Sequence, residues 1–502
     1  MELKELTEKI LELFNTQANG LPESIFDVVI NNKTDYMDKY LDIVSGNVEE
    51  DLLQKIWQYY LADREGKKQD YTPKCLAELV GKLSETDNEE VVLDLCAGSG
   101  ALTIQKWNSN KKLKFICIEI DNNVIPLLLF NLMVRNIDAY VIRKDSLNNS
   151  FNEEIYHVSK GDKYGKLNKV NACQYKADTC ICNPPYNLKW DGSLFGAMDP
   201  RFILYGVPPK SNANFAFILT ALDMVSEKAS FILPNNVLRP TNMDEVNIIK
   251  NLIDTNIVES VILNPDHMFE STSIPTCMLT LNKKKQTTKV EMIDMSDTYV
   301  EEIREQRGQF GGGNSHTNRV YKKTVKSYST EQIQNILSWI KDLIINENAT
   351  QVEINNIKSS GYELRPRVYI QSEAEVRHRE YEDIVNDLNR IRDDKNSLKL
   401  SINENLARSL GFDVELFKQK NNIVLPEQIG HKIKKESYIT FTKNKNQLMF
   451  ENKSSESVNP ILMMILKSWK EFIYYLNIQE NRYLAELRDK LLNDLMTGKI
   501  EV

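Results

Sequence analysis

Residues 91–100 read Val-Val-Leu-Asp-Leu-Cys-Ala-Gly-Ser-Gly, and the expected fold follows from this stretch. Its first half is mostly apolar and indicates a buried strand, which a glycine-rich turn ends. Residues 101–104, Ala-Leu-Thr-Ile, are typical of the start of a helix. A glycine turn between a strand and a helix lets the backbone approach a nucleotide-like ligand closely. The stretch therefore predicts a strand–helix unit of an α/β domain with a ligand site at its turn.

Two acidic residues follow at positions that suit the same ligand. The apolar run 115–118 ends at Glu119, which lies 19 positions after Gly100. This is near the spacing expected for a carboxylate that binds ribose hydroxyls. Asp145 comes after a third strand-like run, 140–142, and could accept a hydrogen bond from the adenine amine of a cofactor.

A second motif lies further along, where the apolar stretch 177–182 is followed by Asn183-Pro184-Pro185-Tyr186. The two prolines stiffen the backbone and hold a carboxamide and an aromatic ring side by side. The carboxamide oxygen and a neighbouring backbone carbonyl can each accept one N–H of a planar amine, which localises its lone pair. The tyrosine ring offers a face on which a base can stack. Taken alone, the motif also fits a tight turn after a buried strand.

The order of these motifs along the chain distinguishes between two kinds of α/β domain. A glycine turn followed by an acid also fits a dinucleotide-binding domain, but residues 98–103, Gly-Ser-Gly-Ala-Leu-Thr, lack the third glycine. A strand, a glycine turn, two acids and then Asn-Pro-Pro-Tyr resembles class I S-adenosylmethionine-dependent methyltransferases, and within them those that methylate amino groups. The resemblance implies a doubly wound, Rossmann-like sheet and S-adenosylmethionine as cofactor.

Four further segments narrow the resemblance. They are residues 70–73 (Asp-Tyr-Thr-Pro), 199–217, 231–238 and 274–279. The set is similar to the modification (M) subunit of type I restriction-modification systems, which is an N6-adenine-specific DNA methyltransferase. This resemblance covers roughly residues 1–370 and implies a site-specific, adenine-specific DNA methyltransferase.

The resemblance also implies roles for individual residues. Residues 71–73 would close over the cofactor, the turn after residue 94 would hold its methionine side, Glu119 its ribose and Asp145 its adenine ring. The implied cofactor-binding positions are Tyr71, Thr72, Pro73, Asp94, Ala97, Gly98, Gly100, Glu119, Asp145 and Asn183. The implied catalytic positions are Asn183, Pro184, Pro185 and Tyr186. Residues 95–98 read Leu-Cys-Ala-Gly where the family usually has Pro-Ala-Cys-Gly, but the glycines are kept, so we expect cofactor binding to be kept.

The expected reaction follows from these roles. The target adenine must leave the duplex because its amine is otherwise buried in the base pair. It would stack on Tyr186 while its amine donates to the Asn183 side chain and the Pro184 carbonyl, and it would then attack the sulfonium methyl group of the cofactor. Phe215 and Phe217 are candidates for a second aromatic beside the base. No metal is expected in this reaction.

The net charge of the chain indicates whether it could bind DNA without a partner subunit. The chain has 502 residues and a net charge of −8, whereas an autonomous DNA-binding protein usually has a basic excess. An acidic chain that acts on double-stranded DNA is better explained if a specificity (S) subunit supplies the recognition, as the resemblance implies. A restriction (R) subunit and a second M copy are further partners that it allows. No apolar run is long enough for a bilayer, so we expect a cytoplasmic protein without membrane partners.

The seven cysteines are odd in number and lie mostly in apolar, strand-like contexts, which favours reduced thiols over a disulfide framework. The five histidines are scattered, so we expect no zinc site at the nearby Cys180 and Cys182.

The chain divides into four parts by pattern. Residues 1–65 show helical periodicity and predict an N-terminal helical domain. Residues 66–345 alternate strand-like and helix-like runs and predict the catalytic domain, with a surface loop at 308–314. Residues 346–458 predict a connector with an amphipathic helix, and residues 459–502 a helical tail that resembles the end of S subunits. The apolar stripe of the amphipathic helix is Ile384, Leu388, Ile391, Leu398 and Ile402, and suits pairing with another helix, such as one of an S subunit, or packing on its own domain.

Three alternatives stay open at this stage. An enzyme of the same fold could methylate another planar amine, on RNA or on a protein glutamine. The chain could also be a stand-alone or anti-phage DNA adenine methyltransferase, although no domain-sized recognition unit is evident between residues 410 and 458. Finally, it could be a non-catalytic assembly subunit with a vestigial site, which the intact set of Asp94, Gly98, Glu119 and Asn183 argues against.

Overall fold

The computed structural model falls into two compact units, Met1–Glu373 and Ala374–Val502, which are described separately. The residues that the structure describes are 3–60, 72–148, 153–269, 274–309, 316–370, 379–409, 439–444, 447–452, 472, 475–488, 490–491 and 494.

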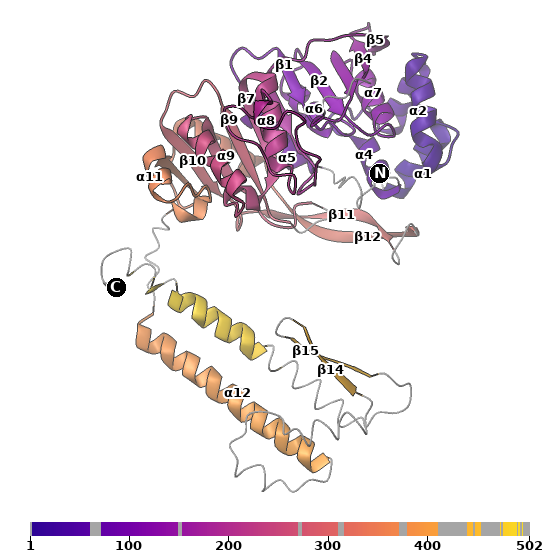
Figure 1. The fold of residues 1–502 in the computed structure, drawn as a ribbon. Coiled ribbons are helices and arrows are strands. Elements are labelled where there is room, and N and C mark those ends of the chain that lie inside the picture. The colour runs from indigo at the N-terminus through magenta and orange to yellow at the C-terminus, as the bar shows by residue number, and fades with distance from the viewer. Residues whose placement is uncertain are drawn as a thin grey trace. The chain divides into compact units, whose positions relative to one another are not determined.

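A large mixed sheet organises the first unit (Figure 1). From edge to edge its strands are β13 (Ala349–Glu353), β10 (Lys289–Asp294), β8 (Val258–Leu263), β9 (Thr276–Asn282), β7 (Val225–Pro234), β6 (Ala177–Cys182), β1 (Val91–Asp94), β2 (Lys114–Glu119), β3 (Ala139–Arg143), β4 (Glu154–Ser159) and β5 (Lys166–Val170). The central strands β3, β2, β1, β6 and β7 are parallel, and β9 runs antiparallel to both of its neighbours. The expected doubly wound α/β sheet is confirmed.

The strand order reverses between β1 and β6. From β1 the chain proceeds outward to β2 and β3, and it then returns to place β6 on the other side of β1. Loops that leave the two strands in opposite directions open a crevice at the carboxyl ends of the strands, and ligands of open α/β sheets bind there. The topology therefore locates the ligand site next to the turn that follows β1.

Alternating side chains of the central strands build one core on each face of the sheet. Val92 of β1 joins one cluster and Leu93 joins the other. The first cluster includes side chains of α5 (Lys74–Leu83), α6 (Ala101–Ser109), α7 (Ile125–Val134) and α10 (Thr330–Asp342). The second includes side chains of α8 (Asn214–Met224), α9 (Met243–Asp254) and α11 (Ile354–Ser359).

The N-terminal helices extend the first core. They are α1 (Leu3–Leu13), α2 (Leu21–Ile30), α3 (Asp35–Ile43) and α4 (Leu52–Tyr60). The ring of Phe130 in α7 contacts those of Phe14 and Tyr40, at centroid distances of 5.6 and 5.2 Å. All ten residues of α7, Ile-Pro-Leu-Leu-Leu-Phe-Asn-Leu-Met-Val, are buried. This helix is apolar on all sides because the sheet covers one face and the N-terminal helices cover the other.

A buried polar network also joins the N-terminal helices to the glycine turn. Arg135, directly after α7, donates through Nη2 to the carbonyl of Glu50 at 2.6 Å and through Nη1 to Asn131 Oδ1 at 2.9 Å. Asn131 in turn donates through Nδ2 to Asp51 Oδ1 and to the Ser99 carbonyl, both at 2.9 Å. The Asn131 carboxamide thus joins Asp51, just before α4, to Ser99 of the glycine turn.

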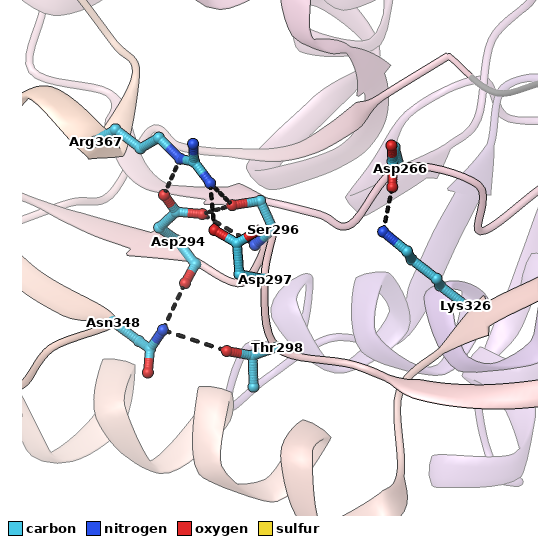
Figure 2. A network of polar contacts seen from close by, with 8 residues as sticks. All are labelled: Asp266, Asp294, Ser296, Asp297, Thr298, Lys326, Asn348 and Arg367. Carbon is cyan, nitrogen blue, oxygen red and sulfur yellow. Dashed lines mark hydrogen bonds and ion pairs between the residues drawn. The ribbon is translucent and has the colours of Figure 1, made fainter. Parts of the chain in front are cut away.

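The last segment of the first unit is anchored to the sheet by ion pairs (Figure 2). Arg367, in a short 3₁₀ turn (Pro366–Val368), donates through Nε to Asp294 at 2.6 Å and through Nη2 to Asp297 at 2.7 Å. Asp294 ends β10, and nearby Asn348 donates to the Asp294 carbonyl at 2.9 Å, just before β13. The sheet thus continues past residue 345, where the sequence pattern placed the end of the catalytic domain.

A separate two-stranded hairpin, β11 (Val300–Gln309) and β12 (His316–Ser327), precedes α10 (Figure 1). Residues 308 and 309 of the expected surface loop 308–314 end β11, and residues 310–314 lie outside the described residues.

The second unit contains the long helix α12 (Tyr381–Ser409), in the segment where an amphipathic helix is expected; the side chain of Ile402 lies outside the described residues. Its Ile384, Leu388 and Ile391 are buried. Arg379, just before it, pairs with Glu486, and Lys395 pairs with Glu480, so α12 packs on the helical residues 475–488 of the same chain. A hairpin of β14 (Ile439–Asn444) and β15 (Gln447–Asn452) completes the described part of this unit, and most of the tail 459–502 lies outside it.

Candidate active site

A cavity of about 390 Å³ lies at the carboxyl ends of β1, β2, β3 and β6, where the strand order reverses. Residues that follow each of these strands meet there. Of the predicted site residues, those that line the cavity are Thr72, Ala97, Gly98, Glu119, Asp145, Asn183, Pro184, Pro185 and Tyr186. Pro73, Asp94 and Gly100 are described but are not part of the lining, and Tyr71 lies outside the described residues.

The glycine turn presents backbone to the cavity. Gly98 has φ +54°, and a Cβ built there would meet no atom within 4 Å, so it faces open space. Gly100 has φ +99° and caps α6, and a Cβ there would come within 2.9 Å of the Leu128 side chain. Both glycines have the left-handed backbone, which glycine adopts without strain. Only Gly98 leaves room beside the cavity; Gly100 packs behind the turn.

Glu119 holds this turn from the end of β2. Its Oε2 accepts the Gly98 N–H at 2.8 Å, and its Oε1 accepts the N–H groups of Ile120 and Asp121 at 2.9 and 2.8 Å. Burial raises the pKa of the Glu119 carboxyl, while these three donors favour its charged form. A carboxylate offers about four acceptor positions. Oε2 therefore keeps one acceptor position for a ligand hydroxyl.

Asp145 follows β3 and belongs to a loop that is tied to the end of β1. Its Oδ1 accepts the Leu147 N–H at 2.9 Å, and its Oδ2 accepts from Asn148 Nδ2 at 2.7 Å. The neighbouring Ser146 hydroxyl donates to the Leu95 carbonyl at 2.8 Å. These contacts hold the Asp145 loop at the same end of the cavity as the glycine turn.

Asp94 ends β1 behind the turn and is completely buried. Its Oδ2 accepts the Thr103 hydroxyl at 2.7 Å, which joins the strand to α6. Burial raises the pKa of Asp94 to about 7. Its position indicates that it supports the turn from behind.

The raised pKa of Asp94 predicts that the stability of the folded chain depends on pH. Between about pH 4 and pH 7 the folded chain holds a proton on Asp94 that the unfolded chain has lost, so this group lowers stability as pH rises through that window. An asparagine side chain in its place would carry no such charge but could still accept from Thr103. As the pH rises from 5 to 8, the free energy of unfolding of the Asp94→Asn variant should therefore increase by about 2–3 kcal/mol relative to that of the parent. Urea unfolding of both proteins at the two pH values checks this, and parallel pH profiles would contradict it.

The tetrapeptide after β6 carries a carboxamide that is held on both sides. Asn183 Nδ2 donates to the Thr72 hydroxyl at 2.8 Å, and the Tyr186 hydroxyl donates to Asn183 Oδ1 at 2.7 Å. The Tyr186 ring meets the ring of Phe269 edge-on, at a centroid distance of 6.0 Å. The oxygen that could accept from a planar amine therefore lies beside an aromatic ring within the cavity wall.

The turn after the tetrapeptide is also fixed by side chains. Asn187 has φ +52°, and its N–H donates to Oδ1 of the buried Asn214 at 3.0 Å. Asn214, the first residue of α8, returns a hydrogen bond through Nδ2 to Asn187 Oδ1 at 3.2 Å. Sequence analysis did not single out either residue, although Asn214 lies in the segment 199–217 that carried the resemblance.

Several residues that line the cavity were not predicted. They are chiefly Trp190, Phe269, Lys189 and Asp191. Of the two candidate aromatics, Phe217 lines the cavity, whereas Phe215 is buried and is not part of the lining. Within the described residues, no group of three or more His, Cys, Asp and Glu side chains could hold a metal ion. No helix in the same part of the chain is long and apolar enough to cross a membrane.

The region of the chain that holds this cavity matches a known protein family. Residues 46–378 match the sequence model of the N-6 DNA Methylase family. The chain belongs to this family. The match includes every residue that lines the cavity.

Two relatives that the chain resembles are type I methylase subunits. The chain is 26% identical over 351 residues to the type I restriction enzyme MpnII methylase subunit of Mycoplasma pneumoniae, covering 66% of this chain and 59% of that protein. It is 23% identical over 409 residues to the MjaVIII methylase subunit of Methanocaldococcus jannaschii, covering 76% and 66%. The chain thus spans about three fifths to two thirds of the lengths of these relatives. The expected resemblance to M subunits is confirmed.

A solved structure agrees with the fold. The crystal structure of the type I restriction-modification methyltransferase subunit from Streptococcus thermophilus has a TM-score of 0.52 and 21% identity, and covers 74% of this chain and 80% of that one. The fold of this N-6 DNA methylase family member is similar to that of this methyltransferase subunit, and it has the doubly wound α/β sheet that the sequence predicted.

Proposed function

We propose that the chain is the modification subunit of a type I restriction-modification system and transfers a methyl group from S-adenosylmethionine to the N6 amine of a flipped adenine in DNA. The observation that carries this proposal is the Asn183 carboxamide, held between Thr72 and Tyr186 in the wall of the cavity that Gly98 and Glu119 also line. One wall thus suits a planar amine, and another suits a nucleoside-like cofactor.

The residues present fit S-adenosylmethionine. Gly98 leaves the space where a Cβ would stand, so the cofactor could approach the backbone of the turn. Glu119 keeps an acceptor position for a ribose hydroxyl, and Asp145 is an acceptor for an adenine amine. A sulfonium methyl group is the electrophile that this cofactor supplies when it is bound.

The chain's own groups would act on the target amine. The Asn183 oxygen and the Pro184 carbonyl would each accept one of its N–H bonds, which draws the lone pair of the nitrogen out of the ring. The Tyr186 ring would stack on the base and fix its plane. Thr72 orients the carboxamide by accepting from Nδ2, so that Oδ1 is the atom offered to the amine. Catalysis would therefore consist of positioning and charge complementarity.

The proposed partners follow from the charge and from the second unit. A net charge of −8 favours an S subunit that supplies much of the phosphate contact and the sequence recognition. We propose that the second unit docks this S subunit, and that an R subunit and a second M copy complete the assembly. The divisions at residues 65 and 458 belong to the same proposal, whereas the boundary at residue 345 is replaced by the end of the first unit at Glu373. We also propose that the enzyme works in the cytoplasm.

The decisive experiment measures transfer of a labelled methyl group from S-adenosylmethionine to unmethylated DNA. The purified chain is assayed alone and after co-expression with an S-type partner, with RNA and a glutamine-containing peptide as other acceptors. We expect N6-methyladenine only with the partner, and sequencing of the product gives the target site. Transfer to RNA or peptide but not to DNA would contradict the proposal, and activity of the chain alone would remove the need for an S subunit.

A further inference from the structure

An exposed apolar stretch lies close to the cavity, in residues 194–204. Single exposed apolar side chains are normal on a protein surface, whereas a cluster marks a binding surface. Leu194 is 96% exposed and Met198 82% exposed, and the large apolar side chains exposed in this stretch are Leu194, Phe195, Met198, Ile203 and Leu204. We call residues 193–204 the apolar loop.

The apolar loop is held rigidly from within. Asp199 is buried and accepts from Arg201 Nε at 3.0 Å, from Arg201 Nη2 at 2.7 Å and from the Ser193 hydroxyl at 2.6 Å. Arg201 also donates through Nη1 to the carbonyl of Leu147, which lines the cavity, at 2.9 Å. The loop therefore presents its apolar side chains on a fixed frame attached to the cavity wall.

A second connection joins the apolar loop to the cavity through aromatic packing. Trp190 lines the cavity, and its ring meets that of Phe202 edge-on at 5.9 Å. Phe202 is buried, whereas the next residue, Ile203, is exposed. The contact between Phe202 and Trp190 therefore joins the apolar loop to the cavity wall. The side chain of Lys210 lies against Gly192, where a built Cβ would come within 2.8 Å of its Cε. A basic group therefore lies beside the start of the loop.

A flipped adenine leaves a gap in the duplex, and unstacking it costs a few kcal/mol. Proteins that distort DNA often insert apolar side chains between base steps to offset this cost. The surface suited to that role must be apolar, rigid and close to the pocket that receives the base, with basic groups nearby for the phosphates. The apolar loop has these four properties, with Lys189 in the cavity lining and Lys210 beside the loop as the basic groups.

We propose that the apolar loop enters the DNA duplex beside the target adenine and fills the space that flipping leaves. This inference rests on the proposed function, since it requires a base to be flipped out of double-stranded DNA. The loop then acts on the step that brings the base into the cavity and leaves the methyl transfer itself unchanged.

The test compares two variants of the assembled methyltransferase on two duplexes that hold its mapped target site. The loop variant is Leu194→Ser with Met198→Ser, and the control variant is Ile344→Ser with Ile345→Ser, which changes two apolar residues outside the loop. In one duplex the target adenine is paired, and in the other it faces an abasic site and is already unpaired. Cofactor binding and melting temperature are measured for every protein. A third duplex, in which 2-aminopurine replaces the target adenine, reports flipping by its fluorescence.

We expect the loop variant to methylate the paired target at least about tenfold more slowly and to give less 2-aminopurine fluorescence. On the unpaired target it should stay within about threefold of the parent, because that base no longer needs to be pulled from a pair. The control variant should match the parent on both duplexes.

Three results would overturn the inference while leaving the proposed function intact: no loss on the paired target, an equal loss on both targets, or loss of the S-type partner from the loop variant on a sizing column. The last result would make the loop a protein-docking surface. If the parent assembly methylates neither duplex, the proposed function itself fails, and the inference fails with it.

Discussion

Replacing Asn183 by alanine is expected to reduce methyl transfer by about a hundred- to a thousandfold while the Kd for the cofactor stays within about threefold. Loss of one preorganised hydrogen-bonding group in an active site typically has an effect of this size. The alanine cannot accept from the target amine, so the nitrogen lone pair stays delocalised in the ring. Glu119 and Gly98, which serve the cofactor side in our proposal, remain in place. Single-turnover methylation and calorimetric titration with S-adenosylmethionine measure the two quantities separately.

Thr72→Val provides a graded comparison for Asn183→Ala. It keeps the carboxamide but removes the acceptor at 2.8 Å that orients it, and an unsatisfied buried N–H costs about 1–3 kcal/mol. We therefore expect a rate between those of the parent and Asn183→Ala. Equal loss of cofactor binding and of methyl transfer in Asn183→Ala would point to a folding defect, and unchanged methyl transfer would exclude Asn183 from catalysis.

Replacing Glu119 by alanine is expected to weaken cofactor binding by about a hundredfold or more. The change removes the acceptor proposed for a ribose hydroxyl and also leaves the N–H groups of Gly98, Ile120 and Asp121 without their partner. Hydrogen bonds to charged groups contribute about 1.5–3 kcal/mol each, so the glycine turn loses both its ligand contact and its support. Calorimetric titration with S-adenosylmethionine and with its demethylated product checks this.

The control for Glu119→Ala is Glu331→Ala, which removes an exposed carboxylate from the first turn of α10. It should bind both nucleosides like the parent. An unchanged Kd in Glu119→Ala would contradict the assignment of Glu119 to the cofactor.

Sequence patterns predicted the features that depend on local interactions. The strand and turn at 91–100 follow from an apolar run and two glycines, which adopt positive φ values without strain. The meeting of Glu119, Asp145 and Asn183 also follows, because residues after parallel strands share one edge of the sheet. The helix at 381–409 was predictable because its apolar spacing repeats every three or four residues.

Contacts between distant segments could not be predicted in this way. The bond from Asn183 to Thr72 joins residues 111 positions apart, and Phe269 reaches the cavity from the segment after β8. Two residues that are two positions apart on a helix point in nearly opposite directions. Only one of Phe215 and Phe217 could therefore face the cavity, and the sequence pattern did not say which. The support of the turn by Asp94 from behind depends on the packing of α6, which the pattern does not specify.

The hydrogen bonds of the Asn131 carboxamide couple the N-terminal helices to the glycine turn. It bonds Asp51 on one side and the Ser99 carbonyl on the other, with the Arg135 guanidinium buried against it. Separating the two parts would break these hydrogen bonds and expose the apolar surface of α7, which is buried along its whole length. Local opening of the helices is therefore coupled to opening of the turn, so a ligand that orders the turn also protects residues 3–60 from exchange and proteolysis. Residues 3–60 are consequently not a detachable module: a chain shortened to begin after them would lose its hold on the cofactor as well.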